Sequence, residues 1–197
     1  YRQALEIRKR LRMGEDAAES YHQLGMVAQK KGDLESAQKC YWRAAEIFKN
    51  LGIEPEAASS FHQLGIVAFL RRDLVEAKKW HCQALSIWER LGIEQRAATD
   101  YQQLGILAQE QGDFELAEKW YQRSLEIKDK LGNKAGVAAS YHQLGVVAHE
   151  RGDFASSKEW HGLSLEINEK LGNERGAATN YHELGRVAQK RRDLELA

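Results

Sequence analysis

The chain has 197 residues, and its 29 lysines and arginines balance its 29 aspartates and glutamates, so the formal net charge at pH 7 is zero. This balance argues against nucleic acid or an anionic membrane as the main partner, because both are bound through basic surfaces. No apolar run approaches the ~20 residues that span a bilayer, and no signal peptide opens the sequence.

A segment of forty residues recurs along the whole chain without insertion or deletion. Its clearest mark is an aromatic residue followed by a Leu-Gly pair, as in Tyr21, Leu24 and Gly25. The aromatic residue returns at Phe61, Tyr101, Tyr141 and Tyr181, each time with the Leu-Gly pair after it. Such a period indicates a repeat array, in which each unit buries its apolar face against its neighbours.

The helical spacing of apolar and small residues predicts two helices in each full unit. Between them, Gly32 is placed to end one helix and Asp33 to cap the next. Gly52 and its equivalents are placed to end each second helix, and the single proline, Pro55, fits the first turn of the following helix. In chain order we expect ten helices: a lone helix at 1–12, four full repeats at 13–52, 53–92, 93–132 and 133–172, and a partial repeat at 173–197 with its helix at about 175–191.

These residues resemble the tetratricopeptide repeat over all 197 positions, with small and aromatic residues such as Ala37 and Tyr41 on each second helix. The forty-residue period, longer than the usual 34, resembles the repeats of kinesin light chains. The Leu-Gly-Asn segments at 131–133 and 171–173 resemble arrays attached to bacterial STAND-type NTPases. The resemblance implies an all-α, right-handed superhelical solenoid of antiparallel helix pairs, with the first helices lining a concave groove.

The same resemblance places the candidate partner-binding residues on the first helices. They form a ladder of Gln and His side chains, able to donate to and accept from a peptide backbone, and an apolar column beside it. Exposed apolar residues in register mark a protein-binding surface. The alternative is that the longer helices turn these positions into the seam between repeats. The predicted site comprises His22, Gln23, Met26, His62, Gln63, Ile66, Phe69, Leu70, Gln102, Gln103, Ile106, His142, Gln143, Val146, His149, His182 and Arg186.

The sequence shows no nucleophile motif, phosphate-binding loop or paired acids at a telling spacing. The column of His22, His62, His142 and His182 has one member in a repeat, and stacked helices lie ~10 Å apart, too far for one ion. We therefore expect no catalytic residue, no bound metal and no cofactor. The two cysteines, Cys40 and Cys82, are too few for a disulfide framework and favour a reduced, cytoplasmic setting.

The sequence thus predicts a non-catalytic scaffold that binds a peptide or helix of a partner protein, without nucleic acid or membrane, as part of a larger multidomain protein. One alternative is the regulatory arm of a STAND-type NTPase whose catalytic part lies elsewhere. Another is an assembly or spacer element. Its ends would stack head-to-tail because Tyr1 and Ala197 occupy the repeat positions of Tyr41 and Ala37. The apolar seams predicted at the ends comprise Ala4, Ile7, Leu11, Tyr181, Leu184 and Ala188.

Overall fold

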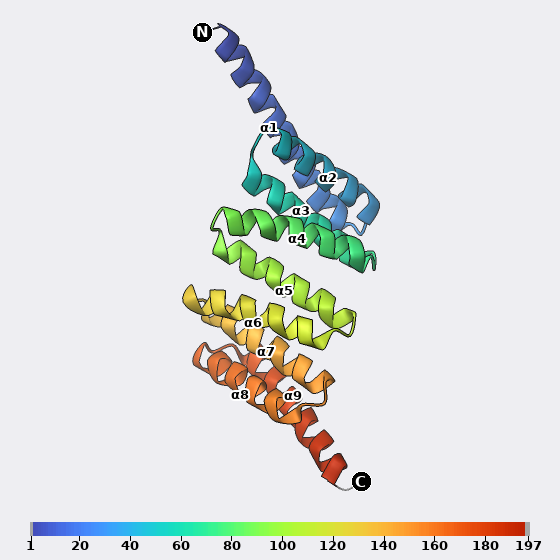
Figure 1. Cartoon of the computed structure of the whole chain (residues 1–197), viewed down its shortest axis with the longest axis vertical. Helices are drawn as coiled ribbons and strands as arrows, with labels where there is room; N and C mark the ends of the chain where they lie inside the picture. The colour runs from blue at the N-terminus through green and yellow to red at the C-terminus, as the bar shows by residue number, and fades with distance from the viewer. Residues whose placement is uncertain (1, 196–197) are drawn as a thin grey trace. The chain divides into compact units, whose positions relative to one another are not determined.

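The computed structural model describes the backbone of residues 2–195 and the side chains of residues 13–190. Over residues 2–195 the chain is all-α, with nine helices that run antiparallel in succession (Figure 1). They are α1 (Arg2–Lys30), α2 (Leu34–Asn50), α3 (Glu54–Leu70), α4 (Leu74–Arg90), α5 (Glu94–Glu110), α6 (Phe114–Lys130), α7 (Lys134–Glu150), α8 (Phe154–Lys170) and α9 (Glu174–Glu195).

The expectation of ten helices is wrong at the start of the chain. The helix predicted at 1–12 and the first helix of the next repeat form the continuous α1. The reason lies at Arg12, which occupies the place of Gly52 and its equivalents, all of which end helices at a positive φ of 66° to 73°. A left-handed residue costs ~1–2 kcal/mol more without a glycine, so nothing local stops the helix at this point.

Arginine also replaces a turn glycine at two other places, with opposite outcomes. Arg72 adopts a φ of 64° between α3 and α4, where the packed pair holds the turn. The equivalent Arg192 lies within α9, which continues to Glu195 and so runs past its predicted end at about 191. Both differences from the sequence expectation therefore occur where an arginine replaces a helix-ending glycine.

The predicted turn inside each full repeat is confirmed. The carboxylates of Asp33, Asp73, Asp113 and Asp153 accept a hydrogen bond from the backbone N–H three residues later, at 3.0–3.1 Å. Gly32 precedes the first of these caps with a φ of 79°. These caps satisfy backbone donors at the start of each second helix and fix where it begins.

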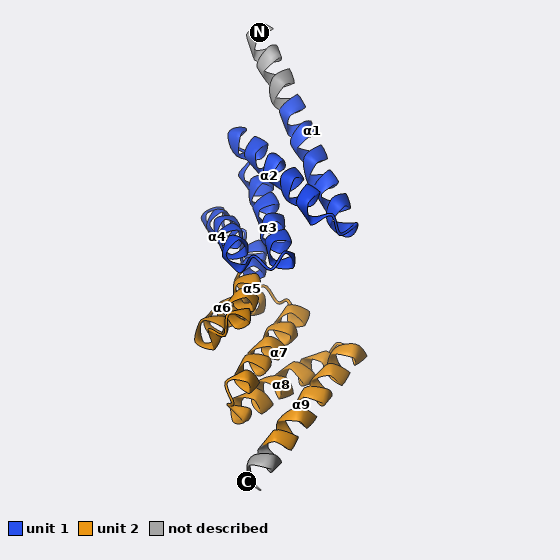
Figure 2. Cartoon of the chain, turned by 90° about the vertical axis from the view of Figure 1, so that its right-hand side faces the viewer, with its two compact units in different colours: residues 1–100 blue, residues 101–197 orange. Residues whose placement is uncertain are grey.

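The chain divides into two compact units, Tyr1–Asp100 and Tyr101–Ala197, with the boundary inside α5 (Figure 2). In the first unit, Ala37 and Tyr41 of α2 pack against Leu64 and Val67 of α3. In the second, the core contains Ala108, Ala117, Tyr121, Leu144 and Val147. Because the units are described separately, the right-handed superhelix stays a prediction.

The Leu-Gly pair has a steric role within each helix pair. The ring of Tyr121 on α6 lies so close to Gly105 on α5 that an added Cβ would meet its Cε1 at 2.6 Å. Gly65 faces the ring of His81 in the same way, with a corresponding distance of 2.5 Å to Nε2. Glycine therefore allows the two helices of a repeat to approach each other across a buried ring.

Within the described part of the chain, no helix combines the length and apolar character needed to cross a lipid bilayer.

Candidate functional site

Each unit has a surface hollow on the side that the family pattern assigns to the groove. The hollow of the first unit has a volume of about 420 Å³ and is lined by Glu19, His22, Gln23 and Met26 of α1, together with Ser59 of α3. The hollow of the second unit, about 330 Å³, is lined in part by Ala139, His142 and Gln143 of α7 and by Thr179 of α9. The same repeat positions therefore line a depression in both units.

The predicted apolar column is exposed to very different degrees. Met26 is 42% exposed, and Leu70 is 50% exposed. Ile66, Phe69 and Val146 are half-buried. Ile106 is partly buried against the core of the second unit. Both interpretations offered by the sequence thus apply in part, because Met26 lies at the surface whereas Ile106 packs against the core between repeats.

Three histidines of the ladder form hydrogen bonds between successive first helices. His22 Nδ1 lies 3.0 Å from Ser60 Oγ, His62 Nδ1 lies 2.7 Å from Asp100 Oδ1, and His142 Nδ1 lies 3.2 Å from Asn180 Oδ1. Each hydrogen bond spans 38 residues and joins one first helix to the next. Nδ1 of these three histidines therefore serves the packing between helices, and contact of the ladder with a peptide backbone stays a prediction.

The other members of the predicted site fall into three groups. Gln23 is exposed and donates to Glu19, whereas Gln63, Gln103 and Gln143 are half-buried. His149 packs edge-on against Phe154 at 5.4 Å. On α9, His182 is exposed and Arg186 forms an ion pair with Glu183 at 2.9 Å. Of the ladder, Gln23 and Gln143 line the hollows together with His22 and His142.

One repeat position carries a buried polar residue in four copies of the repeat and was missed from the sequence. These residues are Ser60, Asp100, Ser140 and Asn180, each at most 1% exposed. We call each of these residues, together with the equivalent repeat positions on the two preceding helices, a junction. The second junction comprises His62, His81, Trp88 and Asp100, the third Gln102, Tyr121, Lys128 and Ser140, and the fourth His142, His161, Asn168 and Asn180.

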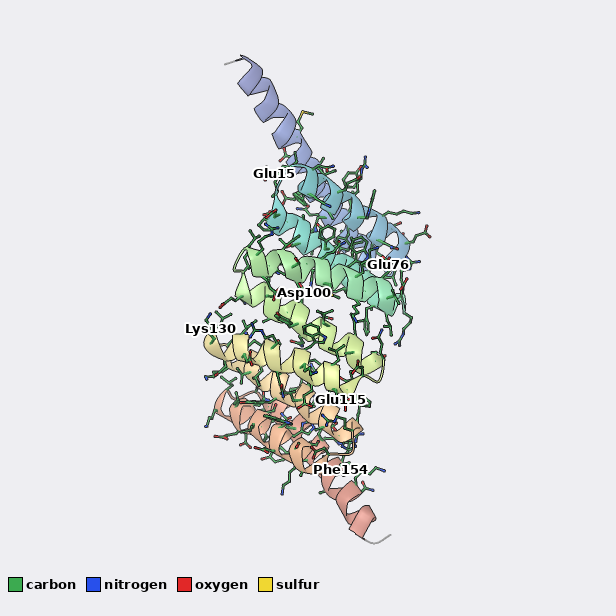
Figure 3. All side chains as sticks on the ribbon, in the orientation of Figure 1. Glu15, Glu76, Asp100, Glu115, Lys130 and Phe154 are labelled. Atoms are coloured by element: carbon green, nitrogen blue, oxygen red, sulfur yellow. The ribbon has the colours of Figure 1, made fainter. Side chains whose placement is uncertain are left out.

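Asp100 is the centre of the second junction and projects from α5 (labelled in Figure 3). Its Oδ1 lies 2.7 Å from Nδ1 of both His62 and His81, and its Oδ2 accepts a hydrogen bond from Trp88 Nε1 at 2.9 Å. Burial by itself raises the pKa of this carboxyl, but the two histidine hydrogen bonds outweigh it and hold the pKa below its usual value. The junction is thus built to keep a carboxylate charged in the interior.

The third and fourth junctions each contain a buried base but no carboxylate. Lys128 is only 8% exposed and donates to Gln102 Oε1 at 2.7 Å and to Ser140 Oγ at 3.1 Å. Burial lowers the pKa of Lys128 to about 8. In the fourth junction, burial and then the neighbouring His142 lower the pKa of His161 to about 4, so its ring is neutral at pH 7.

The sequence contained a signal for these junctions that considering the first helices alone could not reveal. His81 and His161 follow His62 and His142 by nineteen residues, and both rings contact across the helix pair at 5.2–5.3 Å. Together with these two histidines, the polar residue that recurs every forty positions at Ser60, Asp100 and their equivalents completes the signal. The expectation of no metal compared only histidines of successive first helices and did not consider this meeting of three helices.

A further cavity, about 670 Å³, opens in the first unit on another side of α2 and was not predicted. Cys40 stands where the other repeats carry Trp80, Trp120 and Trp160, so the space that an indole fills elsewhere is left open. Tyr21, Trp42 and Trp80 line the cavity, and Trp42 is 47% exposed. This apolar surface lies outside the predicted site.

Models of the tetratricopeptide repeat match residues 18–51, 56–130 and 137–172. The chain belongs to the tetratricopeptide repeat family. No curated protein sequence matches it. The family assignment accounts for the helix pairs, the Leu-Gly column and the rings that pack against it.

Solved structures of Rap proteins, of a putative kinesin light chain and of a STAND protein share the fold. RapI in its apo form has 20% sequence identity and a TM-score of 0.84, covering 100% of this chain and 55% of RapI. A Rap protein complexed with Competence and Sporulation Factor has 20% identity and a TM-score of 0.70, covering 90% of this chain and 50% of that protein.

The kinesin light chain and the STAND protein belong to the two groups that the sequence resembles. A putative kinesin light chain from Podosopora anserina, with nearly identical repeats, has 20% identity and a TM-score of 0.75, covering 89% of this chain and 87% of that one. A STAND protein with a tetratricopeptide repeat sensor, from Pyrococcus horikoshii, has 18% identity and a TM-score of 0.80, covering 87% of this chain and 27% of that one. At these identities the likeness shows the fold alone.

Proposed function

We propose that this chain is a non-catalytic, cytoplasmic scaffold within a larger multidomain protein, and that it binds a peptide or helix of a partner protein along its first-helix face. One observation carries the proposal: equivalent repeat positions line a hollow in each unit. A ligand that follows the array would meet the same kinds of side chain in each unit, including Gln23 and Gln143. Amide side chains can both donate to and accept from a peptide backbone.

The acid–base groups of the chain support a structural rather than a catalytic role. Asp100 and His161 have shifted pKa values, and a shifted pKa in a cleft would mark a candidate active site. Both side chains, however, are no more than 1% exposed and lie in hydrogen-bonded junctions. Tetratricopeptide repeats in general are protein-interaction modules, and a Rap protein of the same fold has been solved with Competence and Sporulation Factor.

Apolar anchors in the second repeat are expected to supply most of the binding energy. Ile66 and Phe69 are half-buried and lie on one face of α3, and Leu70 at its end is exposed. A few well-packed apolar side chains commonly dominate an interface, while the surrounding polar groups set register. The glutamines beside these anchors would then fix the register of the bound segment.

Peptides selected from a random phage-displayed library against the chain provide a test that needs no known partner. Their affinities, measured by fluorescence polarisation, are compared for the wild type, Phe69→Ala, Ile66→Asp and Lys119→Ala. We expect the first two variants to lose binding while retaining their helical circular dichroism, and Lys119→Ala, an exposed position on α6, to bind normally. Equal binding by all four proteins would rule out the first-helix face.

A regulatory arm of a STAND-type NTPase is the second candidate, favoured by the fold shared with the Pyrococcus horikoshii sensor. A phosphate-binding loop elsewhere in the full-length gene product would support it. Head-to-tail assembly has weaker support. Tyr181 is 58% exposed, as that model requires, but Ala4, Ile7 and Leu11 lie outside the described side chains. The continuous α1 also removes the separate half-repeat on which the stacking depended.

A further inference from the structure

The second junction brings three metal-binding side chains to one point. His62 on α3, His81 on α4 and Asp100 on α5 present ligand atoms that all lie within 4.8 Å of one another. All three residues belong to the same unit, Tyr1–Asp100. Asp100 and His81 are buried, whereas the His62 side chain keeps 16% of its surface exposed.

The donor set and its support have the character of a transition-metal site. Two imidazole nitrogens and one carboxylate suit a borderline divalent ion such as Zn²⁺, which is commonly held by three protein ligands and one water molecule. Trp88 Nε1 donates to the carboxylate oxygen that the histidines leave free, at 2.9 Å. Hydrogen bonds of this kind orient the ligands of metal sites.

We propose that His62 Nδ1, His81 Nδ1 and the Asp100 carboxylate bind one divalent transition-metal ion of the Zn²⁺ type, with water as the fourth ligand on the exposed side of His62. Each neutral ring then carries its proton on Nε2, and metal–ligand bonds replace the two hydrogen bonds to Oδ1. Tetrahedral bonds of about 2.0–2.1 Å place neighbouring ligand atoms about 3.3 Å apart. From the present 2.7 Å, each nitrogen has to move away from Oδ1 by about 0.6 Å.

The other junctions show why the site is confined to this one. At the position of Asp100 they carry Ser60, Ser140 and Asn180, which are neutral. The fourth junction comes nearest, with His142 and His161 around Asn180, but a neutral carboxamide is a weaker ligand than a carboxylate. Within the described residues, the second junction is the one group of three side chains arranged to hold an ion.

A bound ion would fasten the second repeat to the first helix of the third. It would link α3, α4 and α5 through their side chains, in addition to their apolar packing. An ion that binds the folded chain and not the unfolded one stabilises it in proportion to the logarithm of its concentration. Zinc would therefore raise the unfolding temperature and stiffen the part of the array that carries Ile66 and Phe69.

The test is a calorimetric titration of Zn²⁺ into the metal-free chain, prepared without a histidine tag, at pH 7.5. We expect one equivalent to bind, and Co²⁺ in place of Zn²⁺ to give the visible absorption of a tetrahedral site. His62→Gln and Asp100→Asn should reduce the affinity by more than ~100-fold, beyond the loss seen when a supporting residue is changed. The chain itself offers both replacements, since Gln102 and Asn180 occupy the equivalent positions.

The matched control is His142→Gln, which makes the same replacement in the junction that lacks a carboxylate. It should still bind one equivalent, and circular dichroism should show all three variants folded. The unfolding temperature should rise with Zn²⁺ for the wild type and His142→Gln and stay constant for the other two. Absence of Zn²⁺ binding to the wild type, or equal binding by wild type, His62→Gln and Asp100→Asn, would show that the junction is a hydrogen-bonded cluster and overturn the proposal.

Discussion

Replacing Gly105 with alanine probes the closest approach within a helix pair. The new Cβ would lie 2.6, 2.7 and 3.0 Å from three carbon atoms of the Tyr121 ring, whereas ordinary contacts begin at about 3.4 Å. Tyr121 is fully buried, and its hydroxyl donates to Gln109 Oε1 at 3.0 Å. The ring therefore has to shift by about 0.8 Å against packed neighbours and strain a hydrogen bond at its far end.

The size of the effect follows from two opposing contributions. Forcing an extra carbon into a packed core costs about 3 kcal/mol at the upper end of the usual range, which a fully buried rigid ring warrants. Alanine in place of glycine in a helix interior returns about 1 kcal/mol. The net loss of unfolding free energy is thus about 2 kcal/mol. With a urea dependence of about 2 kcal/mol/M, the midpoint should fall by about 1 M.

Gly185 provides the matched control because it occupies the same repeat position on α9. A Cβ added there meets nothing within 4 Å, since α9 has no following second helix among the described residues. Gly185→Ala should leave the urea midpoint unchanged or raise it by up to about 0.5 M, through helix propensity alone. Unfolding followed by far-ultraviolet circular dichroism measures both. If the Gly105 variant is as stable as the wild type, or both variants shift in the same direction, the steric reasoning is refuted.

Two further predictions use the shifted bases of the second unit. Because the folded pKa of His161 is about 4, the unfolded chain binds more protons between pH 6.5 and 4, and stability falls as the pH falls through that window. His161→Tyr introduces the residue found at the equivalent positions Tyr41 and Tyr121. It should remove a loss of unfolding free energy on the order of 2 kcal/mol at pH 5. Urea midpoints measured at pH 7.5 and 5 would contradict this if the wild type and the variant lost stability equally. Lys128 has a folded pKa of about 8 and an unfolded value near 10.4, so stability should increase from pH 8 toward 10. In Lys128→Met that increase should disappear, and parallel pH dependences of the two urea midpoints would contradict the assignment.

The sequence alone was enough to determine the repeat, its turns and helices α2 to α8. A forty-residue period in which Asp33 and its equivalents cap second helices leaves little freedom, because capping and helical spacing act over a few neighbouring residues. The long α1 was also readable in principle, since Arg12 breaks the glycine column. It was missed because the glycine stop of the other copies was assumed to hold in the first copy as well.

Only the tertiary structure decided what the polar columns do. His62 could face a groove or a neighbouring helix, and its own sequence surroundings are the same in either case. The choice depends on Asp100 and His81, which lie 38 and 19 residues further along and reach it only after three helices have packed. Local spacing determines which residues share a helix face. It does not determine how deeply that face is covered, because burial depends on the size of side chains on other helices, such as the rings that Gly65 and Gly105 accommodate.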